Sequence, residues 1–166
     1  MRRSAHSTLI VRLLAAALFA GLSFSALASF AVAGSDAVPA VNAADGIGLK
    51  GYDPVAYFVN GRPTKGGDQN RLQWKGVTYR FASAQNLARF KSDPEKYLPQ
   101  YGGYCAYAMS LDRIADIDPS RWAIVDGRLF LNNGLIAQTL WSRNKSGNIS
   151  SADHNWPSYP KQAEGK

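Results

Sequence analysis

The chain has 166 residues, a formal net charge of +7 from 19 basic and 12 acidic side chains, and a single cysteine. One cysteine excludes an internal disulfide, and basic residues scattered without a like-charge run give no groove for nucleic acid. The length and the aromatic content suffice for one hydrophobic core, so we expect one small domain.

The first 33 residues have the layout of a secretory signal peptide. Arg2 and Arg3 form a basic start, residues 13–22 are apolar, and small residues at 26–28 and 31–33 offer cleavage sites. We therefore predict export to the periplasm or cell exterior. Cleavage after residue 33 leaves 16 basic against 12 acidic residues, an excess of +4. The alternative is an uncleaved membrane anchor, since the apolar stretch approaches the ~20 residues that a bilayer requires. The choice between Sec and twin-arginine export stays open.

Residues 34–48 are rich in Ala, Gly and Asp and predict a flexible lead-in to a domain that begins at Leu49. In residues 53–58 a proline precedes alternating apolar positions, which predicts a short buried strand. Residues 61–67 read as a glycine-rich loop. Alternation on both sides of Lys75-Gly76 then predicts a hairpin over residues 72–81.

Ser83 is a suitable N-cap for the helix that follows the hairpin, and Asp93-Pro94 starts a second short helix. Residues 104–110 have helical potential but are short. The second hairpin is marked by Asp126-Gly127, because both central positions of such a turn favour positive φ. Helices are predicted over residues 135–143 and 148–156.

These elements predict an α+β fold: a small single domain of two β-hairpins with short helices packed against them. We expect one core, whose large side chains are Trp74, Tyr79, Phe81, Phe90, Trp122 and Ile124.

Several segments together resemble an exported YHS-domain protein. They are Gly51-Tyr52-Asp53-Pro54-Val55-Ala56-Tyr57-Phe58, the aromatic-Ser stretch at 79–83, Asp93-Pro94-Glu95-Lys96-Tyr97, and Tyr101-Gly102-Gly103-Tyr104-Cys105-Ala106. The resemblance implies a YHS-like domain over residues 49–157, followed by a tail at 158–166. Metal-associated members carry cysteines at positions that correspond here to Ala56, Ala82 and Asn86, so their metal role does not transfer.

The candidate ligand-binding residues are Tyr101, Gly102, Gly103, Tyr104 and Cys105. Tyrosine offers an apolar ring with a polar tip, and paired glycines let backbone amides approach a ligand. A thiol in an exported chain is either sheltered or functional. If it is sheltered, Cys105→Ala is nearly neutral for folding, whereas Cys105→Ser costs more because it buries a hydroxyl.

Two rival functions use the same cysteine. If residues 104–110 are helical, Cys105 and Met109 share a face and, with His154, supply soft ligands of the kind that select Cu(I). Cys105 with His154 as base and Asp153 or Asp126 as orienting acid would instead form a thiol enzyme.

Flanking signatures of a nucleophilic cysteine are absent, so we favour a binding or accessory module over a self-contained enzyme. The partner is a small molecule, a metal ion or a protein. The membrane is a partner only if the N-terminal segment is uncleaved.

Overall fold

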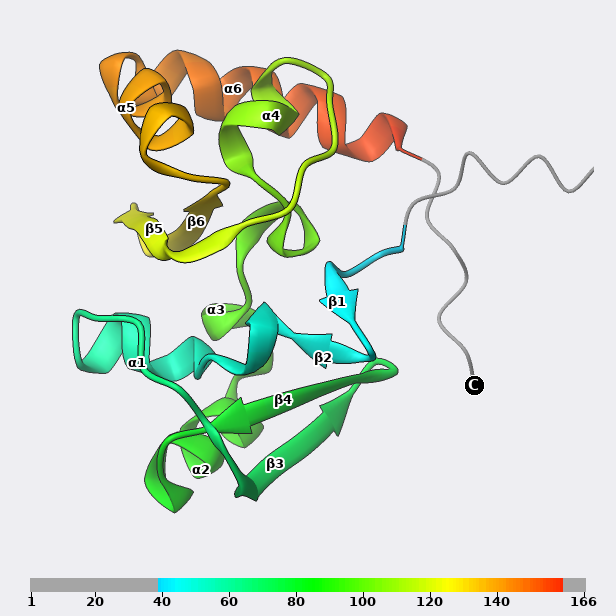
Figure 1. The fold of residues 1–166 in the computed structure, drawn as a ribbon, viewed down its shortest axis with the longest axis vertical. Coiled ribbons are helices and arrows are strands. Elements are labelled where there is room, and N and C mark those ends of the chain that lie inside the picture. The colour runs from blue at the N-terminus through cyan, green and yellow to red at the C-terminus, as the bar shows by residue number, and fades with distance from the viewer. Residues whose placement is uncertain (1–38, 160–166) are drawn as a thin grey trace, which may run out of the picture. The chain divides into compact units, whose positions relative to one another are not determined.

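A computed structural model describes residues 39–159 as an α+β domain (Figure 1). The predicted signal peptide, the start of the lead-in and residues 160–166 of the tail lie outside the described residues. The elements of the first part are β1 (Ala43–Ala44), β2 (Ile47–Gly48), η1 (Leu49–Gly51), α1 (Pro54–Val59), β3 (Gly67–Trp74), β4 (Val77–Phe81), α2 (Ala84–Ser92) and α3 (Pro94–Tyr97). Those of the second part are η2 (Gln100–Gly103), α4 (Ala106–Ser110), β5 (Asp118–Val125), β6 (Arg128–Asn132), α5 (Leu135–Arg143), α6 (Lys145–Asn155) and η3 (Trp156–Ser158).

Within the described residues, a four-stranded sheet has the order β1-β2-β4-β3, and β5 and β6 form a separate hairpin. Strand β2 runs parallel to β4, whereas β1–β2 and β3–β4 are antiparallel. Both predicted hairpins are present. At the second turn Asp126 and Gly127 have φ of 50° and 74°, as the Asp-Gly pair predicts.

Residues 54–59 form helix α1, so the prediction of a strand over residues 53–58 is wrong. Asp53 is the N-cap, its carboxylate accepts hydrogen bonds from the N–H groups of Val55 and Ala56, and Pro54 occupies the first turn. Asp followed by Pro is a helix-start signal, and here it outweighs the alternation of apolar residues. The same signal at Asp93-Pro94 correctly predicts α3.

The other helices follow the sequence signals closely. Ser83 caps α2 and accepts a hydrogen bond from the N–H of Asn86. Helix α5 has the predicted bounds, while α6 begins three residues before the predicted start because Asn144 caps it. Within residues 39–159 every helix is too short or too polar to cross a bilayer.

The last part of the expected flexible lead-in carries regular structure. Ala44 pairs with Ile47 in the β1–β2 turn, and Ile47 pairs with Thr78 of β4. Val41 and Ala43 pack against buried core residues. Composition alone predicted mobility here, but the free edge of β4 supplies backbone partners that order the chain.

Two clusters of buried residues organise the domain on either side of β6. The first lies among the sheet, α1, α2 and α3, and it contains all six predicted core residues, of which Trp74, Trp122 and Ile124 are partly buried. The second joins α4, α5, α6 and η2 around Met109, Phe130 and Trp141. Since side chains alternate along a strand, Leu129 and Leu131 of β6 enter the first cluster and Phe130 enters the second. Figure 1 shows the two groups of helices on opposite sides of the β5–β6 hairpin.

Candidate functional site

The predicted segment Tyr101–Cys105 begins in a constrained backbone. Tyr101, Gly102 and Gly103 all have positive φ, at 56°, 59° and 81°. Glycine accepts this conformation freely, but a tyrosine in it costs on the order of 1–3 kcal/mol and persists only where its surroundings hold it. The ring of Tyr101 is 3% exposed and packs on Phe130 at a centroid distance of 5.9 Å.

Tyr101 and Gly102 line a hollow of about 380 Å³. Its wall combines the aromatic ring of Trp156 with several apolar side chains and with four charged or polar ones. The remaining lining residues are Ala40, Val41, Lys75, Glu95, Leu98, Pro99, Gln100 and Asp153. Trp156 lies beside Tyr101 and Tyr104, at centroid distances of 6.4 and 6.2 Å. The volume falls within the range of small-molecule sites.

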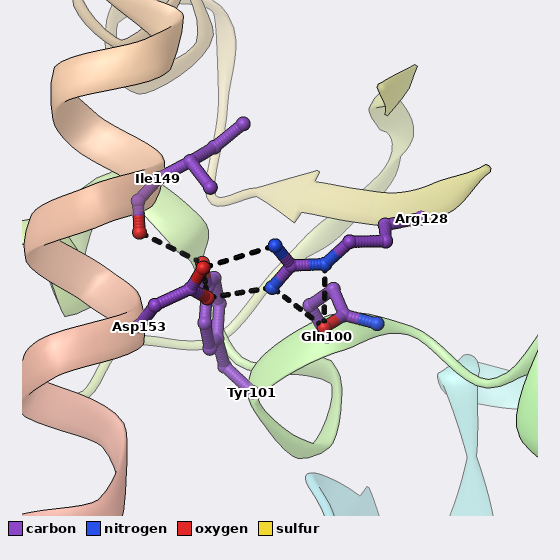
Figure 2. Close-up of polar contacts among 5 residues, drawn as sticks. All are labelled: Gln100, Tyr101, Arg128, Ile149 and Asp153. Atoms are coloured by element: carbon purple, nitrogen blue, oxygen red, sulfur yellow. Dashed lines mark hydrogen bonds and ion pairs between the residues drawn. The ribbon is translucent and has the colours of Figure 1, made fainter. Parts of the chain in front are cut away.

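A network of polar side chains holds the hydroxyl group of Tyr101 in place (Figure 2). Its hydroxyl donates to Asp153 Oδ1 at 2.9 Å, and Arg128 Nη1 donates to Asp153 Oδ2 at 2.9 Å. Arg128 also donates from Nε and Nη2 to the side-chain oxygen of Gln100, at 3.0 and 2.8 Å. The network therefore ties η2, β6 and α6 together with its donors and acceptors matched.

The network shifts the pKa values of Asp153 and Tyr101 in opposite directions. The hydrogen bond from Arg128 lowers the pKa of Asp153, against a smaller opposing effect of partial burial. Burial, followed by the hydrogen bond to Asp153, raises the pKa of Tyr101 well above its usual value. Around neutral pH the carboxylate is thus ionised and the phenol neutral, which is the state that the hydrogen bonds require.

Cys105 lies apart from the hollow as the N-cap of α4 and is 1% exposed. The N–H groups of Ala108 and Asn133 donate to its sulfur at 3.5 and 3.3 Å, and the thiol donates to Asn132 Oδ1 at 3.8 Å. Its burial agrees with the sheltered alternative of the sequence analysis. Tyr104 is also buried, and its hydroxyl donates to the carbonyl of Pro39 at 3.2 Å.

The residues proposed for soft-metal binding differ in environment. Met109 is fully buried in the second cluster, whereas His154 is exposed on α6. Cys105 and Met109 do lie one helical turn apart, as predicted. In the part of the chain that the structure describes, no three His, Cys, Asp or Glu side chains gather as a metal site would need. Asp153, considered as an orienting acid for His154, is engaged by Arg128 and Tyr101. Copper binding and thiol catalysis stay predictions.

A second polar centre lies in the first cluster, around the fully buried carboxylate of Asp53. Oδ1 accepts from the N–H groups of Val55 and Ala56 at 2.8 and 3.2 Å. Oδ2 accepts from the N–H of Ala82 at 2.9 Å and from Asn86 Nδ2 at 2.7 Å. Four donors on one carboxylate compensate for its burial, so Asp53 joins α1, β4 and α2 as a structural element.

The profile of the YHS domain family matches residues 55–101. The chain contains a YHS domain. No curated protein and no solved structure gave a significant match. The YHS match spans α1 to the first part of η2, so Tyr101 falls at its end and Gly102–Cys105 lie beyond it. A YHS-like unit extending over residues 49–157 stays a prediction.

The YHS resemblance assigned cysteines of metal-associated members to the positions of Ala56, Ala82 and Asn86. In this YHS domain all three residues donate a hydrogen bond to Asp53. The three positions are therefore neighbours in space, as residues that share one metal site would have to be. In this chain the carboxylate of Asp53 lies between them and accepts their hydrogen bonds.

Sequence analysis did not single out Gln100 and Trp156 of the wall of the hollow, or Asn42 and Arg128, which contact the Tyr101 segment and its partners. One signal was readable: Ile149, Asp153 and Trp156 recur at spacings of four and three, which places the first two on one face of α6 and Trp156 on the same side at its C-cap. No comparable pattern marks Arg128 or Asn42, because their partners are 25 and more residues away.

Proposed function

We propose that this protein is an exported binding module that holds a small, uncharged molecule with a flat apolar face in the hollow beside Tyr101, Gly102 and Trp156. The observation that carries the proposal is this aromatic hollow next to a backbone held in a strained conformation. Strained residues persist where the surrounding structure enforces them, and they cluster at ligand sites.

The charges around the hollow favour an uncharged ligand. Lys75 pairs with Glu95 at 2.9 Å, and Asp153 pairs with Arg128. A charged ligand would have to compete with these pairs, whereas a neutral one can accept or donate hydrogen bonds without breaking them. Trp156 and Leu98, which are partly exposed, then supply apolar surface for a flat molecule.

A larger hollow of about 770 Å³ lies between the β5–β6 turn and the start of α6. Its lining is mostly exposed polar side chains, including Arg143, Lys145 and three serines, with only Val125 and Ile149 apolar. Ligand sites bury most of the ligand against apolar and aromatic groups, so the smaller hollow is the better candidate.

The binding proposal is tested by ligand-detected saturation-transfer NMR with benzyl alcohol, benzoate and benzylammonium, which differ mainly in charge. We expect the strongest transfer to benzyl alcohol, and its loss in Trp156→Ala. The control is Leu135→Ala, which changes a side chain that is 62% exposed and lies outside the hollow. Thermal melts of each variant confirm that it is folded. Equal transfer to all three probes, unchanged by Trp156→Ala, contradicts the proposal.

The export part of the proposal has its own test. N-terminal sequencing of the exported protein should return Ser29 or Gly34, because the small residues before them fit a signal peptidase. A sequence that starts at Met1 would support the membrane-anchor alternative.

A further inference from the structure

Residues 39–42, here called the N-terminal strap, lie across Gly102 and Gly103. The N–H of Asn42 donates to the carbonyl of Gly102 at 2.8 Å. Asn42 Nδ2 donates both to the carbonyl of Gly103 at 3.2 Å and to Asp116 Oδ1 at 2.9 Å. The strap is also held at its start, where Pro39 accepts from Tyr104. One asparagine thus contacts two of the predicted ligand-binding residues.

The fit between the strap and Gly102 explains why this position lacks a side chain. A Cβ placed on Gly102 would lie 2.2 Å from the carbonyl oxygen of Ala40. The approach of backbone to backbone therefore requires glycine, in addition to the positive φ. Sequence analysis read Gly102-Gly103 as an opening for a ligand, and the chain's own N-terminal strap occupies that space.

The strap also contributes to the hollow, because Ala40 and Val41 form part of its wall. We propose that Asn42 is a positioning residue that holds the strap on Gly102 and Gly103 and thereby completes the ligand site. This inference rests on the proposed function for its ligand, but the docking of the strap is a property of the protein alone.

Asp116 supports the role of Asn42. Partial burial opposes ionisation of Asp116, but hydrogen bonds from Lys50 and Asn42 outweigh it, and the pKa of Asp116 is lowered. The carboxylate is thus ionised at neutral pH and accepts from the Asn42 amide. The strap is a short edge segment, and such segments open with little free energy when their few contacts are lost.

Docking of the strap and binding of a ligand are linked. A ligand that contacts Ala40 or Val41 binds more tightly to the docked state, so it reduces opening of the strap. Loss of the Asn42 contacts weakens ligand binding in proportion to the fall in the docked fraction. A hydrogen bond contributes about 1 kcal/mol net, which corresponds to about a fivefold change in an equilibrium constant.

The experiment is hydrogen–deuterium exchange of the mature chain, read at residues 40–42, in the parent, in Asn42→Ala and in the control Asn70→Ala on β3. We expect about fivefold faster exchange of the strap amides in Asn42→Ala, with the amides of β4 unchanged and the control like the parent. Unchanged exchange in Asn42→Ala overturns the inference, whether or not any probe binds.

The ligand arm uses benzyl alcohol. Slower exchange of the strap amides when benzyl alcohol is bound supports the completed site. Strap exchange that bound benzyl alcohol leaves unchanged overturns that part of the inference while leaving the proposed function in place. If the parent does not bind the probe, the proposed function fails, and the exchange result alone decides the role of Asn42. Asn42→Asp, which removes the donor and adds a charge beside Asp116, should open the strap further than Asn42→Ala.

Discussion

The two buried clusters differ in how completely their most buried polar side chain is hydrogen-bonded. In the first, Asp53 is fully buried and its carboxylate accepts four hydrogen bonds. In the second, Asn132 is equally buried, yet its Nδ2 has no hydrogen-bond partner among the described residues. A buried donor without an acceptor lowers stability, whereas a saturated carboxylate holds its elements in one arrangement. Each cluster also holds an indole N–H without a partner among the described residues, Trp74 in the first and Trp141 in the second, so the contrast is confined to Asp53 and Asn132.

The YHS domain at residues 55–101 covers most of the first cluster, including Ala82 and Asn86, although Asp53 itself precedes the match. The strained backbone of η2 and the hollow lie at the end of the match. The candidate site therefore lies where residues of both clusters meet. Stable elements hold the strained segment, as functional sites on rigid supports require.

The largest expected effect is in the first cluster. Phe81 is fully buried and packs on Phe90 at a centroid distance of 5.1 Å. Phe81→Ala should lower the free energy of unfolding by about 3 to 5 kcal/mol, measured by urea denaturation. Leu111→Ala, at a side chain that is 50% exposed, is the control and should change it little. A Phe81→Ala curve that overlays the parent would show that Phe81 is not part of the stabilising core.

Asp53→Asn tests the saturated carboxylate directly. The amide nitrogen cannot accept, so at least one of the four donors loses its partner, at a cost of about 1–3 kcal/mol. Asp68→Asn provides the matched control, because the side chain of Asp68 is 66% exposed and pairs only at the surface with Arg80. Equal unfolding midpoints for the two variants would show that the Asp53 network does not distinguish the first cluster.

A smaller effect is expected at Cys105, and here the structure reverses the ranking drawn from the sequence. Because the sulfur caps α4, Cys105→Ala loses the cap and should cost about 1 kcal/mol. Cys105→Ser should be better tolerated, since serine is a favoured N-cap and Asn132 Oδ1 can accept from its hydroxyl. Thermal unfolding of both variants measures the ranking. A higher midpoint for the alanine variant would contradict the capping role.

Burial of the same thiol predicts its reactivity. Cys105 is 1% exposed, so native protein should react slowly with iodoacetamide at neutral pH and rapidly once unfolded in urea. Mass spectrometry of timed samples gives both rates. Fast labelling of the folded chain, suppressed by Cu(I) in the parent but not in a His154→Ala, Met109→Leu double variant, would support the soft-metal alternative.

The smallest expected effect is the pH dependence of stability that comes from the ion pair between Asp153 and Arg128. The pKa of Asp153 is lowered in the folded state, so its contribution to stability is present above its unfolded value of about 3.9 and is lost as pH falls through the lower folded value. The stability difference between the parent and Asp153→Asn should therefore be constant from pH 7 to about pH 5 and shrink below. Both groups of the ion pair are partly exposed, so the difference stays small. A constant difference down to pH 2 would contradict the pairing.

Much of the fold was readable because its signals are local. The turn at Asp126-Gly127, the cap at Ser83 and the start at Asp93-Pro94 each act through neighbours within four residues. Alternation predicted Trp74, Tyr79, Phe81, Trp122 and Ile124 of the hairpins as core residues, but not the more deeply buried Leu129, Phe130 and Leu131 of β6. The strand predicted at residues 53–58 failed because two local signals competed there, and the cap at Asp53 also drew on Ala82 and Asn86, which are 29 and 33 residues away.

The sequence by itself determined the α+β class, the two hairpins, most helix bounds and the YHS resemblance, and it named Tyr101 and Gly102 as candidate ligand-binding residues. Tertiary structure alone decided that Cys105 is a buried helix cap, that Gly102 accommodates the strap, and that Asn42, Arg128 and Asp153 meet the Tyr101 segment. Local propensities act within a turn of helix or a tight loop. The cap at Cys105 is itself local, through the N–H of Ala108, but the contact of its thiol with Asn132 and the contacts of Asn42 and Arg128 join residues from 25 to 74 positions apart. Only the packing of the two clusters on β6 brings such residues together.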